Sequence, residues 1–280
     1  MAWIRLLRLP LLPSTFCDIL CGAALAGGLD RGQFPTLLVL LAGSALLYLS
    51  GMVWNDVADA DRDRTLGARR PIADGDIPRL AAAVLALLLM GGGLWCLAWD
   101  PVWPLALSLA LGILLYDFLG NRRPWLGAPL LGTVRATNLL LGMIGMGSLP
   151  ALPDLWIPAL YGLSIALIVG HGSLEDRQSM QVLHRGRQLR LLAVPLPFLC
   201  AFVLPHPWLV VLGASPQAFL LLRSVTYASP PTAAGTGLLL RGISRFTAAV
   251  GLGTGQWILA VTCLLLAWAV PPLLGRIRWS

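Results

Sequence analysis

Lysine is absent from this chain of 280 residues, and charged residues of all kinds make up only 12% of it. Ordinary soluble domains are about 25% charged. All twenty basic residues are arginines, and although the net charge is +7, no basic domain concentrates it. The sequence therefore does not predict a protein that binds nucleic acid, and it shows no internal repeat and no low-complexity tail.

Cysteine is also scarce. The five cysteines lie apart and mostly within apolar runs, and only Cys17 and Cys21 are one helical turn from each other. This spacing is neither a disulfide framework nor a zinc-binding signature. We interpret the cysteines as small hydrophobic residues.

Apolar residues dominate what remains, at 57% of the chain, with a mean hydropathy of +0.78. A membrane-spanning helix needs about 20 such residues in a row. The sequence predicts an all-α polytopic membrane protein, with about nine transmembrane helices in one domain of residues 1–280 and no soluble domain. The predicted spans are 12–29, 34–54, 79–99, 101–118, 126–148, 155–173, 189–205, 207–223 and 254–275.

The N-terminal segment has early arginines, an apolar stretch and then small residues, as a signal peptide does. We favour an uncleaved first span, because so many spans follow it. With a cytoplasmic N-terminus, sixteen of the twenty arginines fall on the cytoplasmic side of the predicted spans. Arg276 and Arg278 do not, and the region 214–253 is too rich in Pro and Gly to place; another span count there would bring both inside.

A cluster of acids follows the second predicted span, in the stretch NDVADADRDRTLGARRPIADG of residues 55–75. On a helix turning 100° per residue, Asn55, Asp56, Asp59 and Asp63 fall at about 0°, 100°, 40° and 80°, and Asp61 at about 240°. One face thus carries an amide and three carboxylates, which repel one another. A Mg²⁺ ion bridging to a substrate phosphate would relieve this repulsion; the alternative is a solvated helix end paired with the adjacent arginines.

This stretch resembles the first aspartate-rich motif of the UbiA-type intramembrane prenyltransferases, Asn-Asp-x-x-Asp-x-x-x-Asp followed by Arg-Pro-x-x-x-Gly. The loop residues that match are Arg70, Pro71 and Gly75. Many members have arginine where this chain has Ala60, and Arg62 supplies a charge from the same face.

The resemblance continues at 114–142, where Tyr116, Arg122 and Arg123 match a tyrosine and basic residues near the diphosphate. Arg135 and Asn138 match an Arg-x-x-Asn in the fifth span. An arginine in the middle of a span is a functional-site hypothesis by itself. The alternative is a structural pair with another buried group, such as Asp18 in the first span.

The second aspartate-rich motif of the family is incomplete in this chain. Glu175 and Asp176 resemble its end, but its upstream aspartate is missing and His171 stands near that place. Nitrogen is a poorer ligand than oxygen for Mg²⁺. Glu175 and Asp176 are therefore weaker candidate ligands than Asp56, Asp59 and Asp63.

The resemblance implies a ring of helices around a central cavity in the membrane and a Mg²⁺-dependent prenyltransferase. Asp56, Asp59, Asp63 and Asp176 would be catalytic, and Asn55, Arg62, Arg70, Tyr116, Arg122, Arg123, Arg135 and Asn138 would bind substrate. The expected partners are a prenyl diphosphate, a small hydrophobic or aromatic acceptor and membrane lipid. The expected location is the bacterial inner membrane, with the N-terminus and both aspartate-rich loops cytoplasmic.

Two other functions are considered. A non-catalytic carrier of polyprenyl lipids on the same scaffold would tolerate the incomplete second motif. A phosphatidyltransferase-type enzyme also carries clustered aspartates, but it expects Asp-Gly before the cluster, whereas Asp74-Gly75 follows it here.

Overall fold

A computed structural model of the chain describes residues 2–121, 123–174, 180–226 and 233–276, and every regular element in these ranges is a helix. Six helices in the described ranges are long and apolar enough to cross a membrane. The all-helical class is thereby confirmed, with six candidate membrane helices. The count of about nine spans is not confirmed, because the predicted spans 126–148, 189–205 and 254–275 are outside these six.

The elements of the first half agree closely with the predicted spans. They are α1 (Ala2–Leu7), η1 (Leu9–Leu11), α2 (Pro13–Leu25), η2 (Arg31–Gln33), α3 (Phe34–Leu66), α4 (Arg79–Cys96), α5 (Trp103–Leu115), the π-helix η3 (Tyr116–Gly120) and α6 (Pro124–Gly145).

The second half differs from the prediction in two places. Its elements are η4 (Leu152–Leu155), α7 (Trp156–Gly172), α8 (Met180–Ala193), α9 (Leu196–Leu199), η5 (Cys200–Phe202), α10 (Pro207–Thr226), α11 (Ala233–Gly253) and α12 (Trp257–Arg276).

The predicted span 189–205 is wrong as a single helix, because it is divided between the end of α8, α9 and η5. Pro195 and Pro197 lack the amide hydrogens that a continuous helix would need there. Conversely, α11 occupies part of the region that could not be placed from the sequence. The nine predicted spans, which leave the C-terminus outside, therefore do not include α11, a helix of 21 residues.

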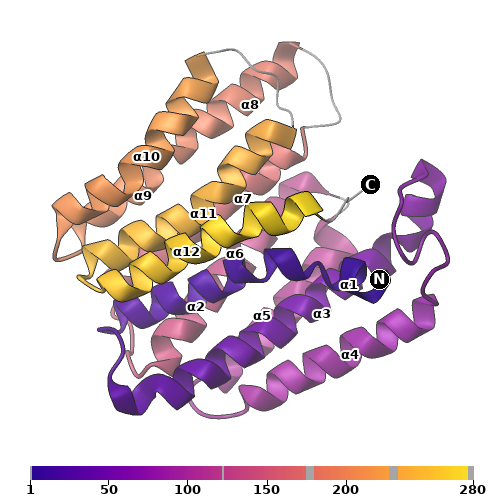
Figure 1. The fold of residues 1–280 in the computed structure, drawn as a ribbon, viewed down its shortest axis with the longest axis horizontal. Coiled ribbons are helices and arrows are strands. Elements are labelled where there is room, and N and C mark those ends of the chain that lie inside the picture. The colour runs from indigo at the N-terminus through magenta and orange to yellow at the C-terminus, as the bar shows by residue number, and fades with distance from the viewer. Residues whose placement is uncertain (1, 122, 175–179, 227–232, 277–280) are drawn as a thin grey trace.

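α2 lies at the centre of the arrangement and contacts α3, α6, α11 and α12 (Figure 1). The early helices α3 to α5 gather on one side of it and α10 to α12 on the other, with α6 and α7 packed together between them (Figure 1). Segments from both halves of the sequence thus share one helix as a common support.

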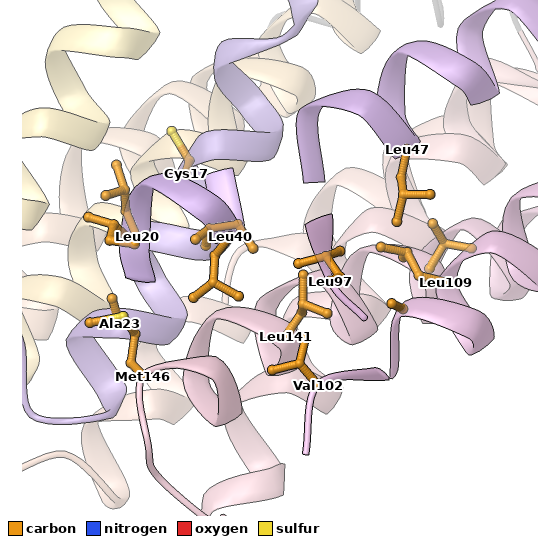
Figure 2. Packing of buried hydrophobic residues seen from close by; sticks show 14 of the residues in the cluster. Cys17, Leu20, Ala23, Leu40, Leu47, Leu97, Val102, Leu109, Leu141 and Met146 are labelled. Carbon is orange, nitrogen blue, oxygen red and sulfur yellow. The ribbon is translucent and has the colours of Figure 1, made fainter. Parts of the chain in front are cut away.

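The main hydrophobic core joins the helices around α2. Figure 2 shows part of it, with Cys17 and Leu20 from α2, Leu40 and Leu47 from α3, and Leu141 from α6. A second cluster packs α7 against α10 and α11. A third cluster packs α1 and the loop between α3 and α4 against those two helices.

The outer surface is apolar as well. On α4, Leu80, Leu88 and Trp95 are exposed, Trp95 by 83%. Large apolar side chains at such positions would be costly in water and suit contact with lipid. The helical bundle therefore has apolar side chains on its inside and on its outside.

Glycines let α2 and α6 approach backbone to backbone. A Cβ atom at Gly22 would lie 2.3 Å from the carbonyl oxygen of Leu139, and one at Gly142 would lie 2.5 Å from that of Ile19. Small residues at helix crossings allow this close packing in membranes. The crossing places polar residues of α2 directly against those of α6.

We expect Gly142→Ala to lower the free energy of unfolding by about 1–3 kcal/mol, because the added methyl group overpacks the crossing. Unfolding in detergent, followed by circular dichroism, measures this change. Gly91→Ala is the matched control, since a Cβ atom at Gly91 on α4 meets no atom within 4 Å. Equal stability of the two variants would contradict the proposed role of the crossing.

Candidate active site

The acidic face predicted from the sequence lies at the end of α3. The helix runs unbroken to Leu66 and ends at Gly67, whose left-handed conformation (φ 66°) closes the last turn. Asp56, Asp59 and Asp63 are therefore on one face, and their exposed fractions are only 2%, 5% and 6%.

Asp61 faces the other way, as the helical angles predict. It is exposed and pairs with Arg79 at 3.0 Å and with Arg64 at 3.5 Å. Arg62 is also exposed. Its predicted role in substrate binding stays a prediction.

Two arginines pair with carboxylates of the buried acidic face. Arg70 Nη1 lies 2.7 Å from Asp56 Oδ1, and Arg70 Nε lies 3.3 Å from Asp63 Oδ2. Arg8 Nη2 lies 2.5 Å from the same oxygen of Asp56. The sequence analysis identified Arg70 but missed Arg8, which comes from the N-terminal segment, 48 residues away from Asp56.

The loop after α3 holds Arg70 in this position. Ile72 and Ile77 of the loop are buried against Val53 and Val57 of α3. Arg5 of α1 donates a hydrogen bond to the carbonyl oxygen of Arg69 at 3.0 Å. The hydrophobic anchor and this bond together fix the loop, and α1 with it, over the acidic face.

A π-helix at Tyr116–Gly120 brings two further polar side chains to the face. Its wider turn is closed by the amide of Asn121, which donates to the carbonyl oxygen of Tyr116 at 2.7 Å. The side chain of Asn121 donates to Asp59, and that of Asn55 donates to Asp117 at 3.5 Å. Such π-turns are frequent at functional sites, but no sequence rule used above predicts one here.

A cavity of about 320 Å³ lies between α2, α3, α5, η3 and α6. Its lining is charged or polar at Arg8, Asn55, Asp117 and Asn121, and apolar at positions such as Leu109 and Val134. The full lining comprises Arg8, Thr15, Ser44, Tyr48, Gly51, Met52, Asn55, Leu109, Ile113, Tyr116, Asp117, Asn121, Leu131, Val134, Arg135 and Asn138.

Arg135 and Asn138 border this cavity, and both are bound to Asp18. Arg135 Nη2 donates to Asp18 Oδ1, and Asn138 Nδ2 donates to Asp18 Oδ2, each at 2.9 Å. Tyr161 also donates to Asp18. The structure thus contains the pair considered as the structural alternative for Arg135.

Hydroxyl and carbonyl groups complete this buried network. Arg135 Nη2 donates to the carbonyl oxygen of Ser14 at 2.8 Å, and Asn138 donates to Thr15 Oγ1 at 2.9 Å. Ser44 of α3 donates to Asn138 Oδ1 at 2.7 Å. The network therefore ties α2, α3 and α6 together in the interior of the protein.

The other predicted residues are distributed as follows. Tyr116 lines the cavity. Arg123 is exposed at the start of α6. His171 is buried and lies 3.2 Å from Thr236 through Nδ1. Arg122, Glu175 and Asp176 lie outside the described residues, so their assignments stay predictions.

Within the described ranges, no group of three His, Cys, Asp or Glu side chains is close enough to hold a metal ion. Mg²⁺ commonly binds through one or two carboxylates and completes its shell with water and substrate phosphate. The buried carboxylates of Asp56, Asp59 and Asp63 supply the hard oxygen ligands that this mode requires. The donor set thus fits a magnesium ion shared with a phosphate-bearing substrate.

Comparison with known proteins identifies relatives across almost the whole chain. The family model described as the UbiA prenyltransferase family matches residues 16–247. No curated protein matches the chain. Among solved structures, a UbiA homologue from Archaeoglobus fulgidus bound to DMAPP and Mg²⁺ has a TM-score of 0.68 at 12% identity, covering 92% of this chain and 99% of that chain.

Two further solved structures are similar. A structure from work on digeranylgeranylglyceryl phosphate synthase in membranes has a TM-score of 0.64 at 17% identity, covering 94% of this chain and 98% of that chain. A UbiA homologue from Aeropyrum pernix K1 has a TM-score of 0.62 at 15% identity, covering 92% of this chain and 98% of that chain. At these identities the likeness shows a shared fold.

We expect Arg135→Met to lower the free energy of unfolding by roughly 3–5 kcal/mol, because it leaves the Asp18 carboxylate buried without its cation. Adding Asp18→Asn is expected to recover more than half of this loss. Unfolding in detergent measures both variants. Arg79→Met, which breaks an exposed pair with Asp61, is the control and is expected to cost less than about 1 kcal/mol.

Proposed function

Because this chain belongs to the UbiA prenyltransferase family, we propose that it transfers a prenyl group from a prenyl diphosphate to a small acceptor within the membrane, in a Mg²⁺-dependent reaction. The observation that carries this proposal is the buried acidic face of α3, which lies beside Arg8 and Arg70 next to a largely apolar cavity. The homologue structures bound to DMAPP or GPP with Mg²⁺ support it.

One or two of the carboxylates of Asp56, Asp59 and Asp63 would hold the magnesium ion at a time, with Asn55 positioning them and with Glu175 and Asp176 as the predicted second set. When bound, Mg²⁺ would supply positive charge for the departing diphosphate. Arg8 and Arg70 form ion pairs with Asp56. Their guanidinium groups are therefore close enough to bind diphosphate oxygens at the same face. Fixed cations stabilise negative charge as it develops on a leaving group.

The cavity suits the apolar part of such a reaction. Leu109, Ile113, Leu131 and Val134 offer an apolar wall to the isoprenoid chain. Tyr48 and Tyr116 also line the cavity, and aromatic faces attract the positive charge of an allylic cation. Exclusion of water by these apolar walls would protect the cation from hydrolysis.

The apolar helices and the family indicate an integral membrane protein. We propose that the divided segment α8–η5, together with α6, α11 and α12, also crosses the membrane. α11 adds a tenth crossing to the nine predicted spans. With an even number of crossings, Arg276 at the end of α12 lies on the same side of the membrane as Arg5 and Arg8. This side is the cytoplasm under the positive-inside rule, and we propose the bacterial inner membrane.

Replacement of the acidic face tests the reaction. We expect Asp59→Ala to reduce prenyl transfer by at least a hundredfold, about 2.7 kcal/mol of barrier, because a ligand of the metal and diphosphate is lost. Release of diphosphate from geranyl diphosphate with Mg²⁺ by purified protein measures it. Asp61→Asn, on the exposed side of α3, is expected to change the rate less than twofold.

An Asp59→Ala variant as active as the unmodified protein would contradict this assignment. If the unmodified protein bound prenyl diphosphates tightly but released no diphosphate with any donor, the carrier function would replace the enzyme.

Single cysteines test the orientation, in a variant from which the five native cysteines are removed. Leu66→Cys and His184→Cys are exposed positions on the proposed cytoplasmic side. In intact cells we expect both to resist a membrane-impermeant thiol reagent and to react after permeabilisation. Leu152→Cys, exposed between α6 and α7, is the control that reacts in intact cells. Labelling of only one of the first two would break the proposed topology.

A further inference from the structure

The last third of the chain has a positive charge that none of its own residues can balance. Residues 177–280 contain nine arginines and no aspartate or glutamate, whereas residues 1–176 contain eleven arginines and all thirteen carboxylates. The net charge of +7 therefore belongs entirely to residues 177–280. A counter-charge for an arginine in this part must come from the earlier part of the chain or from another molecule.

Arg245 is the arginine for which this shortage matters most. It is half-buried on α11, eight residues before the helix ends at Gly253. An arginine at such a depth in a membrane helix is costly unless it is paired. Among the described residues, its guanidinium group makes one hydrogen bond, from Nη1 to Oε1 of the uncharged Gln217 on α10. By contrast, Arg135 has the carboxylate of Asp18 at 2.9 Å.

Gln217 holds the guanidinium group of Arg245 where α10 and α11 meet. The Gln217 side chain is buried and lies over Gly242, where an added Cβ atom would be 2.8 Å from its Nε2 atom. Arg245 and Gln217 line a cavity of about 30 Å³ between α7, α9, α10 and α11. This volume holds about one or two water molecules. A larger anion must therefore reach Arg245 from the outer surface of these helices.

That surface is both basic and apolar. Arg241 is exposed and lies one helical turn before Arg245, so the two arginines share a face of α11 and repel each other. Helical side chains point towards the helix N-terminus, which is the proposed cytoplasmic end of α11. Leu240, next to Arg241, is 48% exposed, and Phe219, two residues after Gln217, is 64% exposed. An anion that carries apolar chains fits this combination.

We propose that Arg241 and Arg245 bind the phosphate group of an anionic phospholipid from the cytoplasmic leaflet. Guanidinium groups bind phosphate oxygens through paired N–H donors, and basic sites between membrane helices on this side suit anionic headgroups. The exposed apolar side chains of α10 and α11 would contact the acyl chains. The inference goes beyond the proposed reaction, because neither arginine lines the cavity assigned to the prenyl donor.

Lipid binding to the purified full-length protein tests this site. Native mass spectrometry in a maltoside detergent measures the binding of dioleoylphosphatidylglycerol, which is anionic, and of dioleoylphosphatidylcholine, which has the same chains and no net charge. We expect phosphatidylglycerol to bind at least tenfold more tightly, because only it supplies the missing counter-charge. A large excess of inorganic phosphate is expected not to displace it, since a free anion brings no acyl chains.

Arg241→Gln combined with Arg245→Gln is expected to lower the affinity for phosphatidylglycerol at least tenfold and to leave phosphatidylcholine binding unchanged. Arg185→Gln with Arg187→Gln is the matched control. It removes two exposed arginines from α8, changes the net charge equally, and is expected to lower the affinity less than twofold. Gln217→Leu keeps both α11 arginines but removes the hydrogen bond to Arg245, and we expect a loss of about threefold.

Thermal unfolding checks that each variant is folded. Equal binding of the two lipids, displacement of phosphatidylglycerol by inorganic phosphate, or equal losses in the two double variants would overturn the inference. If the Arg241 and Arg245 double variant does not fold, Gln217→Leu decides, and an affinity equal to that of the unmodified protein would then overturn it. Diphosphate release from a prenyl donor is a separate measurement, so the proposed function and this lipid site can fail independently.

Discussion

A carboxylate that leaves water for the interior of a helical bundle must find a cation or hydrogen-bond donors, and this requirement organises the protein. Two such groups of carboxylates exist among the described residues. Asp18 is satisfied by Arg135, Asn138 and Tyr161 deep between α2, α6 and α7. Asp56 and Asp63 are paired at the end of α3 with Arg8, which follows α1, and with Arg70 in the loop after α3.

The two groups differ in what they do. The first is a network of side chains from packed helices, and it holds those helices together. The second relies on Arg8 and Arg70, whose side chains remain partly exposed. Ligands can therefore reach the arginines of the second group, where a metal and a diphosphate would take over the contacts with Asp56.

Much of this arrangement follows from periodicity along one helix. α3 needs only to continue past the apolar run. Helical periodicity then places Asp56, Asp59 and Asp63 on one face and directs Asp61 outward. The pairing of Arg135 with Asp18 was foreseen as an alternative, because few groups in the apolar interior can balance an arginine. Arg8 and Asn121 were missed, because they reach the face from distant elements whose positions depend on tertiary packing.

Two errors in the helices have local causes. Glycines and prolines in 214–253 suggested a broken chain, yet α11 forms because its glycines suit close packing, as at Gly242 and Gly251, where neighbouring side chains fill the space. The predicted span 189–205 looked continuous by hydropathy, which does not register the missing amides of Pro195 and Pro197. The π-turn at η3 likewise leaves hydropathy unchanged while it reorients Asp117 and Asn121.

The glycine contacts also determine how the molecule can deform. Gly132 of α6 and Gly162 of α7 meet backbone to backbone, as Gly22 and Gly142 do between α2 and α6. Close backbone contacts at these glycines, together with the side-chain network around Asp18, hold the three helices to one another. α1 and the loop of residues 67–78 lie over the acidic face, joined by the bond from Arg5 to Arg69 and by the buried side chains of Leu6, Ile72 and Ile77. A substrate that enters the cavity from this end would therefore have to displace α1 and the loop as one unit.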